Sequence, residues 1–115
     1  MAFYYRLQID AEGTTTHNKI SQVLKIDSIS KDYWIYERIV NEENDDYDFI
    51  NDFLGMLDGK YDALEALGIN RDDISFWQLY EYDQQCNMEF DPLRMKRLGE
   101  MGITLCISCW QKPGN

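Results

Sequence analysis

The chain has 115 residues, which is enough for one domain and too few for two. Hydrophobic side chains make up 44% of it and charged side chains 28%, a composition that supports a packed core. There are 21 acidic residues and 11 basic ones, so the formal net charge is −10 at neutral pH. Lys and Arg neutralise nucleic-acid phosphates and anionic lipids, so their shortage argues against a nucleic-acid partner and against a membrane partner.

No apolar run reaches the ~20 residues that span a bilayer, and the first residues lack the basic-then-apolar order of a signal peptide. The three cysteines, Cys86, Cys106 and Cys109, are an odd number, which is unfavourable for a disulfide framework. We therefore expect reduced thiols and a cytoplasmic protein. We also expect one domain over residues 1–110 and a polar C-terminal tail over residues 111–115.

The first forty residues predict a strand, a helix and a second strand. Hydrophobic and polar side chains alternate over residues 3–9, a period of two that is typical of a half-buried strand. Gly13 and the threonines at 14–16 supply turn and N-cap chemistry for a short helix that ends near Ile26. Residues 33–40 are rich in aromatic and β-branched side chains and predict the second strand.

A longer helix is predicted after the second strand. Over residues 49–67, hydrophobic side chains recur every three or four positions and form one apolar stripe. Gly68 stands where a helix commonly ends in a left-handed conformation. Gly55 and Gly59 each weaken the helix interior by up to ~1 kcal/mol, so a kink or a break can occur there.

The last forty residues repeat the order strand, helix, strand. Residues 74–82 alternate as a strand, and residues 87–90 can extend it or pair with it after a turn. Asp91 and Pro92 form a good helix opening, because Asp caps the first turn and Pro needs no amide partner there. Residues 103–110 predict a last strand that is buried on both faces.

This order of elements predicts an α+β fold with a β-α-β unit, a long helix and then a β(β)-α-β unit. We expect a single domain with a mixed four- or five-stranded sheet and helices on one face. The two outer units are similar in length and plan, which suggests a repeat of architecture.

Catalytic and metal-binding patterns are scarce. Cys106 and Cys109 have the CxxC spacing of redox and zinc sites, but residues three apart in a strand point to opposite faces, so we interpret both as packing residues. His17 is the only histidine and has no local carboxylate or nucleophile, which favours an imidazole on the helix surface. The acidic run from Asn44 to Asp48 lacks the glycine and glutamate positions of a calcium loop. We predict no enzyme activity, no cofactor and no metal site.

The strongest functional signal is the position of the acidic residues. Between Glu42 and Glu65 there are nine carboxylates and one base, a local charge of −8. Such a segment attracts a basic protein and speeds its association, although an acidic helix face also serves solubility alone. Tyrosines within the segment add rigid contact area. The candidate partner-binding residues are Glu42, Glu43, Asp45, Asp46, Tyr47, Asp48, Asp52, Asp58, Asp62 and Glu65.

The C-terminal third carries a helix opening, a Gly-Ile turn and alternating apolar residues. These features lie at Asp91, Pro92, Leu93, Leu98, Gly102, Ile103, Leu105, Ile107 and Trp110. They resemble the closing segment of bacterial proteins grouped as domain of unknown function 4279. The matching residues serve packing and turns, so the resemblance implies a shared fold and carries over no active site.

Small acidic bacterial proteins of this type resemble immunity proteins, which neutralise a toxin domain. We expect a non-enzymatic immunity or inhibitor protein that binds a basic toxin domain. A nuclease is attractive as the toxin, because its substrate cleft is positively charged and a carboxylate array can occupy it in place of phosphates. The alternative is a structural or protein-binding module whose acidity serves only solubility and whose partner docks elsewhere, for example on a sheet edge.

Overall fold

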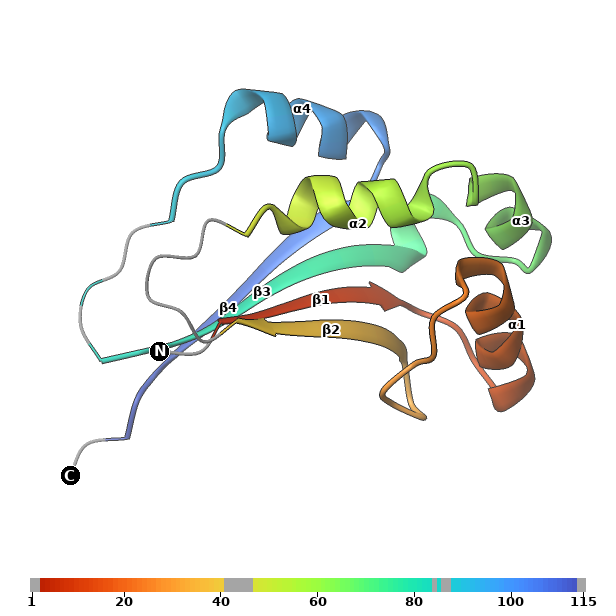
Figure 1. Ribbon diagram of the computed structural model, residues 1–115, viewed down its shortest axis with the longest axis horizontal. Coiled ribbons are helices and arrows are strands. Elements are labelled where there is room, and N and C mark those ends of the chain that lie inside the picture. The colour runs from red at the N-terminus through yellow and green to blue at the C-terminus, as the bar shows by residue number, and fades with distance from the viewer. Residues whose placement is uncertain (1–2, 41–46, 84, 86–87, 114–115) are drawn as a thin grey trace.

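The structure, a computed structural model, describes residues 3–40, 47–83, 85 and 88–113. Over these residues the chain forms a single α+β domain with four strands, four α-helices and one turn of 3-10 helix (Figure 1). The α+β class and the four-stranded mixed sheet confirm the prediction, which expected three helices rather than four. In chain order the elements are β1 (Phe3–Ile9), α1 (Thr14–Leu24), β2 (Trp34–Val40), α2 (Phe49–Leu57), α3 (Tyr61–Ala66), η1 (Arg71–Asp73), β3 (Ile74–Tyr82), α4 (Pro92–Glu100) and β4 (Thr104–Gln111).

The sheet is mixed, with the strand order β2-β1-β3-β4. Strand β1 pairs antiparallel with both neighbours, whereas β3 and β4 are parallel. A parallel pair needs a connection that returns along the whole strand, and α4 provides it. The two outer units therefore share an order of elements but differ in strand direction, so the suggested repeat of architecture does not extend to their pairing.

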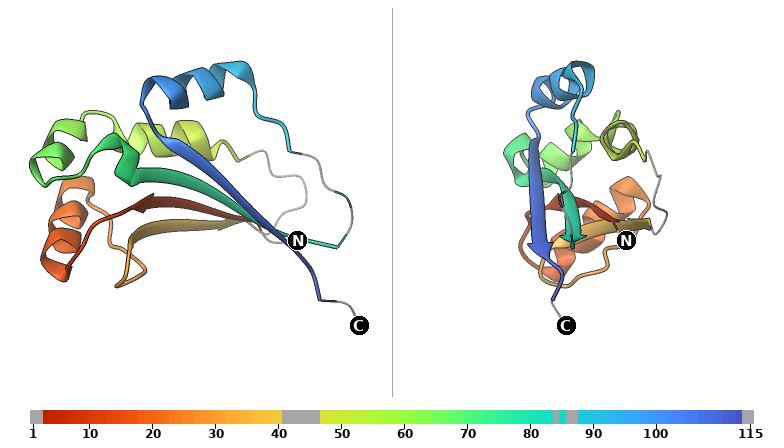
Figure 2. Two further views of the ribbon diagram at one scale, coloured as in Figure 1. Left: turned by 180° about the vertical axis from the view of Figure 1, so that it is seen from behind. Right: turned by 90° about the vertical axis from the view of Figure 1, so that its left-hand side faces the viewer.

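The helices lie on one side of the sheet. Helices α2 and α4 are neighbours above the strands, and α1 and α3 lie beside each other at one end of the sheet (Figures 1 and 2). The core fills the space between the two layers. Phe53 of α2 is fully buried, and its ring meets Phe76 of β3 edge to face at 5.3 Å between centroids. The same ring contacts Tyr36 of β2 and Phe49 of α2, so aromatic packing joins helix and sheet.

The predicted long helix is broken in two. Helix α2 ends at Leu57 and α3 begins at Tyr61, and Gly59 between them has a left-handed φ of +74°. Leu57 and Leu64 are both buried, so the break lets each segment keep its apolar side on the core. Gly55, the other glycine of the segment, continues inside α2.

The prediction that the last strand is buried on both faces is wrong. Strand β4 lies at the edge of the sheet and runs on past the helices toward the C-terminus (Figure 2). Ile103, just before the strand, is buried, but Ile107 is 45% exposed and Trp110 39% exposed. The sequence of an apolar strand does not show whether the strand is central or at an edge, because the order of strands in a sheet is decided by tertiary structure. Gln111, assigned to the tail, is the last residue of β4.

Three further expectations fall differently from the prediction. His17 is buried, and its Nε2 donates to the carbonyl oxygen of Ala11 at 2.7 Å, so the imidazole is part of the packing of α1 rather than of its surface. Gly13 occupies the N-cap of α1 and no side chain caps this helix. Residues 88–90 belong to no strand. Residue 87, the first residue of that predicted extension, and Cys86 lie outside the described residues.

Candidate functional site

The structure separates the predicted acidic residues into three groups. Glu42, Glu43, Asp45 and Asp46 lie outside the described residues. Tyr47 and Asp48 lead into α2 and take part in contacts with other elements. The remaining carboxylates are exposed on α2, on α3 and in the turn between them, and we call them the acidic surface: Asp52, Asp58, Asp62 and Glu65.

Asp48 has a structural role at the start of α2. Its Oδ1 accepts a hydrogen bond from the backbone N–H of Asn51 at 3.1 Å, so the carboxylate caps the helix. The guanidinium of Arg94 on α4 binds the same carboxylate through two nitrogens. These hydrogen bonds, led by those from Arg94, lower the pKa of Asp48 from 3.8 to about 2. Asp48 is therefore ionised at neutral pH and largely committed to holding α2 against α4.

Arg94 also pairs with Asp91, the residue that caps its own helix. Nη1 of Arg94 lies 2.6 Å from Oδ1 of Asp91, and Oδ2 of Asp91 accepts from the backbone N–H of Arg94. The side-chain contact lowers the pKa of Asp91 and raises that of Arg94. Nε, Nη1 and Nη2 of the guanidinium are thus all engaged by carboxylates.

Tyr47 connects the start of α2 to the edge of the sheet. Its hydroxyl donates to the carboxylate of Asp52, and the guanidinium of Arg38 on β2 lies 4.4 Å from the centre of its ring. Burial, followed by the contact with Asp52, raises the pKa of the Tyr47 hydroxyl, so the phenol stays protonated at neutral pH.

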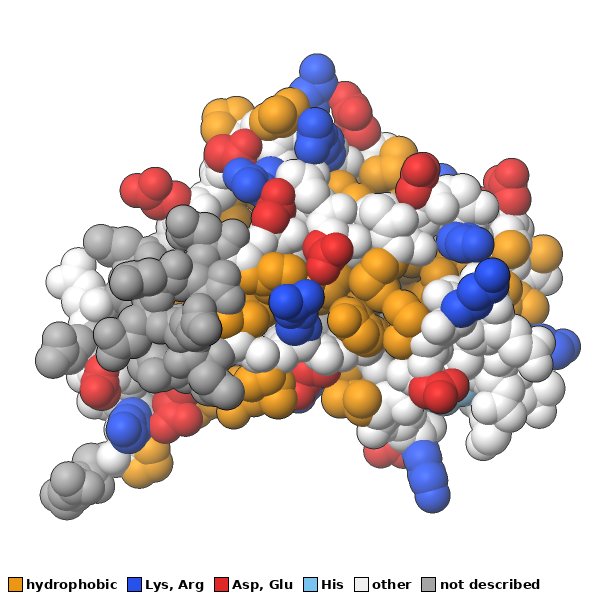
Figure 3. Space-filling model, in the orientation of Figure 1, with side chains coloured by type: hydrophobic (Ala, Val, Ile, Leu, Met, Phe, Trp, Pro, Cys, Tyr) orange, Lys and Arg blue, Asp and Glu red, His pale blue; other side chains and the backbone are white. Residues whose placement is uncertain are grey.

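The acidic surface keeps most of its charge available. Glu65 approaches Arg71 at 4.0 Å, the limit of an ion pair. Asp52, Asp58 and Asp62 make no ion pair within the described part of the chain. Figure 3 shows acidic side chains spread over the helical half of the molecule, with basic ones among them and an apolar band between helices and sheet.

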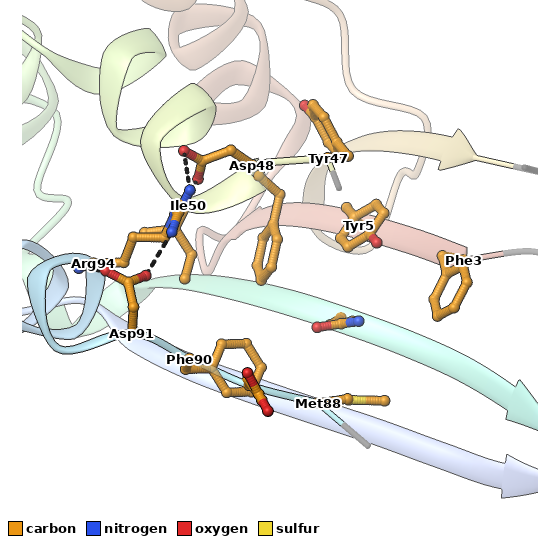
Figure 4. A pocket seen from close by; sticks show the side chains of 12 residues that line it. Phe3, Tyr5, Tyr47, Asp48, Ile50, Met88, Phe90, Asp91 and Arg94 are labelled. Atoms are coloured by element: carbon orange, nitrogen blue, oxygen red, sulfur yellow. Dashed lines mark hydrogen bonds and ion pairs between the residues drawn. The ribbon is translucent and has the colours of Figure 1, made fainter. Parts of the chain in front are cut away.

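A cavity of about 480 Å³ opens between the start of α2 and the segment that leads into α4 (Figure 4). We call it the aromatic hollow. Asp48, Arg94 and Asp91 stand at one end of it, Phe3 lies at the other, and Phe90 lines the side opposite Tyr47. The lining residues are Phe3, Tyr5, Tyr47, Asp48, Phe49, Ile50, Gln78, Met88, Glu89, Phe90, Asp91 and Arg94.

The aromatic walls of the hollow are fixed by ring contacts. Tyr5 of β1 meets Phe49 at 4.9 Å between centroids and Tyr47 edge to face at 5.1 Å. Phe3 stacks on Tyr80 of β3 at 4.8 Å. Offset and edge-to-face pairs of this kind each contribute roughly 0.5–1.5 kcal/mol beyond their buried area. The walls are therefore held in place without a ligand.

Gln78 is the unusual residue of the hollow. It occupies an inward position of β3 and is only 8% exposed, yet its side-chain amide makes no hydrogen bond within the residues that the structure describes. Among the described residues, the fully enclosed side-chain N and O atoms without a partner are the Tyr61 hydroxyl and Nε of Arg71, so the amide of Gln78 remains accessible to solvent from the hollow. Gln78 lines the hollow, so a molecule bound there could satisfy it.

Sequence reasoning identified only part of this site. Gln78 carried a signal, since it is the polar residue in the inward series Ile74, Phe76, Tyr80 of an alternating strand. Arg94 carried none, because 46 residues separate it from Asp48 and only the packing of α4 on α2 joins them.

The hollow offers both polar and aromatic groups to a ligand. Its lining provides carboxylates, one guanidinium, one amide and aromatic faces.

Cys106 and Cys109 are free thiols on β4, and burial raises the pKa of Cys106. The described residues contain no group of three or more His, Cys, Asp or Glu side chains able to hold a metal ion. Nor is any helix in these ranges both long enough and apolar enough to cross a bilayer.

No family model, curated protein or solved structure matches this chain.

Proposed function

We propose that this protein is a non-enzymatic immunity or inhibitor protein that binds and neutralises a basic toxin domain. The acidic surface on α2 and α3 is the contact that attracts the toxin. A nuclease domain is the partner that fits best, because carboxylates can occupy a cleft built for phosphates. A cytoplasmic location belongs to the proposal and is supported by the odd number of cysteines.

The observation that carries the proposal is the availability of the carboxylates. Asp52, Asp58 and Asp62 are exposed, and none is neutralised by an ion pair within the described ranges. Asp58 and Asp62 can therefore pair with a partner protein without first breaking an ion pair, whereas Asp52 also accepts a hydrogen bond from the Tyr47 hydroxyl. Opposite charge then raises the association rate toward ~10⁸ M⁻¹s⁻¹ at low salt.

The test is a capture experiment with two charge-matched variants. Tagged protein retains partners from a lysate of the source cell, and bound proteins are eluted with rising salt and identified by mass spectrometry. The first variant carries Asp52→Asn, Asp58→Asn and Asp62→Asn. Asp48 is left intact because it caps α2.

The second variant is the control and carries Asp27→Asn, Asp32→Asn and Asp83→Asn, three exposed residues outside the acidic surface. Both variants lose the same charge, so only position differs. We expect a basic protein that the wild type and the control retain, that salt releases and that the first variant loses. The captured protein should also slow cell growth when it is expressed alone, and co-expression of the wild-type protein that captured it should relieve that defect. Equal retention by both variants would remove the acidic surface from the mechanism.

A second candidate is favoured by the edge strand. Ile107 and Trp110 on β4 are exposed apolar side chains, and no other strand of the described residues pairs with the outer edge of β4, which is a site where a partner can add a strand. In this case the protein is a binding module and its acidity serves solubility. Capture would then depend weakly on salt, and Trp110→Lys would abolish it while the Asp52, Asp58 and Asp62 variant would not.

A further inference from the structure

The aromatic hollow lies beyond the acidic surface, and one of its lining residues, Gln78, carries an amide that makes no hydrogen bond to another described residue. Gln78 is an inward-facing residue of β3 and is nine-tenths buried, and its side chain has no hydrogen-bond partner in the described part of the chain. The cavity of about 480 Å³ in front of it is large enough for an amino-acid side chain. The amide is open to water in the hollow, so a ligand that fills the cavity displaces that water and binds well only if it replaces the hydrogen bonds.

The charged residues that line the hollow favour a positively charged group on the ligand. Three carboxylates, from Asp48, Glu89 and Asp91, and one guanidinium, from Arg94, line it. The guanidinium of Arg94 donates to both Asp48 and Asp91, so two carboxylates offset its single positive charge, and the lining keeps a net negative charge that favours a cation. Glu89 is exposed and makes no ion pair among the described residues, so one carboxylate remains available for a cation.

The walls select the shape of the cation. Tyr5, Phe49 and Phe90 present aromatic faces and edges to the cavity. A planar guanidinium stacks on aromatic rings and donates several hydrogen bonds in one plane, whereas an ammonium is a compact and strongly hydrated charge. The methylene stem of an arginine side chain also fits apolar walls, because it is itself apolar.

We propose that the aromatic hollow binds an arginine side chain, with its guanidinium donating to the carbonyl oxygen of Gln78 and to the carboxylate of Glu89. This inference rests on the proposed function, since the arginine belongs to the basic partner. The acidic surface attracts that partner, and the hollow fixes its register by accepting one side chain, as buried anchors do at protein interfaces.

The test titrates the isolated protein with N-acetyl-L-arginine N-methylamide and follows backbone amide signals by NMR. The lysine analogue replaces the planar cation, and the citrulline analogue keeps the shape without the charge. We expect saturable shifts around Tyr5, Gln78 and Phe90 with the arginine analogue, with a millimolar dissociation constant because a single side chain contributes little area. The lysine analogue binds at least about threefold more weakly. The citrulline analogue produces no saturable shift.

Two isosteric variants identify the groups that bind. Gln78→Met and Glu89→Gln should each weaken arginine binding by at least about threefold, since each removes one acceptor. Gln8→Met on the opposite face of β1 and Glu12→Gln outside the hollow are the matched controls and should leave it unchanged. The thermal midpoint and the spectrum of the free Gln78→Met protein show that it is folded, and Glu89→Gln tests the proposal independently of the core.

Shifts outside the hollow, equal binding of the citrulline analogue or wild-type binding by both variants would overturn the proposal. The titration needs no partner protein, so its failure differs from failure of the proposed function. Equal capture by the two charge variants, with intact arginine binding, refutes the acidic surface alone. Intact capture with no arginine binding refutes the hollow alone.

Discussion

Arg94 of α4 donates hydrogen bonds to both oxygens of the Asp48 carboxylate, with Nε 2.9 Å from Oδ1 and Nη2 3.0 Å from Oδ2. This bidentate contact joins the first turn of α2 to the first turn of α4, where Asp91 engages the third nitrogen of the same guanidinium. Charge-assisted bonds in parallel fix direction as well as distance. The contact thereby sets one end of the aromatic hollow and holds its two helical sides together.

Replacing Asp48 tests this contact. We expect Asp48→Ala to lower the free energy of unfolding by about 1 kcal/mol or more at neutral pH, because α2 loses its cap and Arg94 loses a partner. Asp48→Asn should lose less, since Asn also caps helices. Chemical denaturation measures both changes. Asp62→Ala, an exposed residue of α3, is the control and should stay within about 0.5 kcal/mol.

The stabilising effect of Asp48 should depend on pH. The pKa of Asp48 is about 2 in the folded chain against an ordinary 3.8, so its ionised form stabilises the fold. That contribution is fully present above pH 3.8 and is lost as the pH falls through about 2. The difference in unfolding free energy between wild type and Asp48→Ala should therefore narrow between these values. A constant difference would show that the carboxylate charge contributes nothing.

Two glycines in the former long helix should respond to alanine with opposite signs. Gly59→Ala should lower the free energy of unfolding by about 1–2 kcal/mol, because a Cβ is strained at a φ of +74°. Gly55→Ala should raise it by up to about 1 kcal/mol, because this position is helical and a Cβ there meets no atom within 4 Å. Equal signs in denaturant titrations would contradict the break between α2 and α3.

Two isoleucines, one just before β4 and one within it, should differ in their contribution to the free energy of unfolding. Ile103 is 6% exposed, so Ile103→Ala should cost about 2–4 kcal/mol of unfolding free energy. Ile107 is 45% exposed at the sheet edge, and Ile107→Ala should cost less than about 1 kcal/mol. Thermal denaturation compares the two variants. Similar losses would mean that β4 is covered along its length.

The two thiols of β4 should differ in reactivity. Burial raises the pKa of Cys106, which reduces its thiolate fraction, whereas Cys109 is exposed. Iodoacetamide at about pH 8 should modify Cys109 before Cys106. Peptide mass spectrometry resolves each cysteine, and the denatured chain supplies the reference in which the two rates become similar. Faster modification of Cys106 would contradict its burial.

Local patterns predicted most of the secondary structure. Alternation identified β1 and β3, and Asp91 with Pro92 identified the start of α4, because these signals depend on neighbours in the chain. The break at Gly59 was open in the sequence, since a glycine permits a left-handed turn without requiring it. The burial of β4 was predicted wrongly, because its apolar composition suits a central strand and an edge strand equally.

The sequence by itself determined the excess of carboxylates, the alternation of the strands and the place of the acidic residues along the chain. Only the tertiary structure decided what those carboxylates do. It turned Asp48 inward to Arg94 and left Asp58 and Asp62 in solvent. It also set Gln78 into the aromatic hollow. The physical reason is that charge and periodicity are properties of neighbours in sequence, whereas a partner 46 residues away is supplied only by packing.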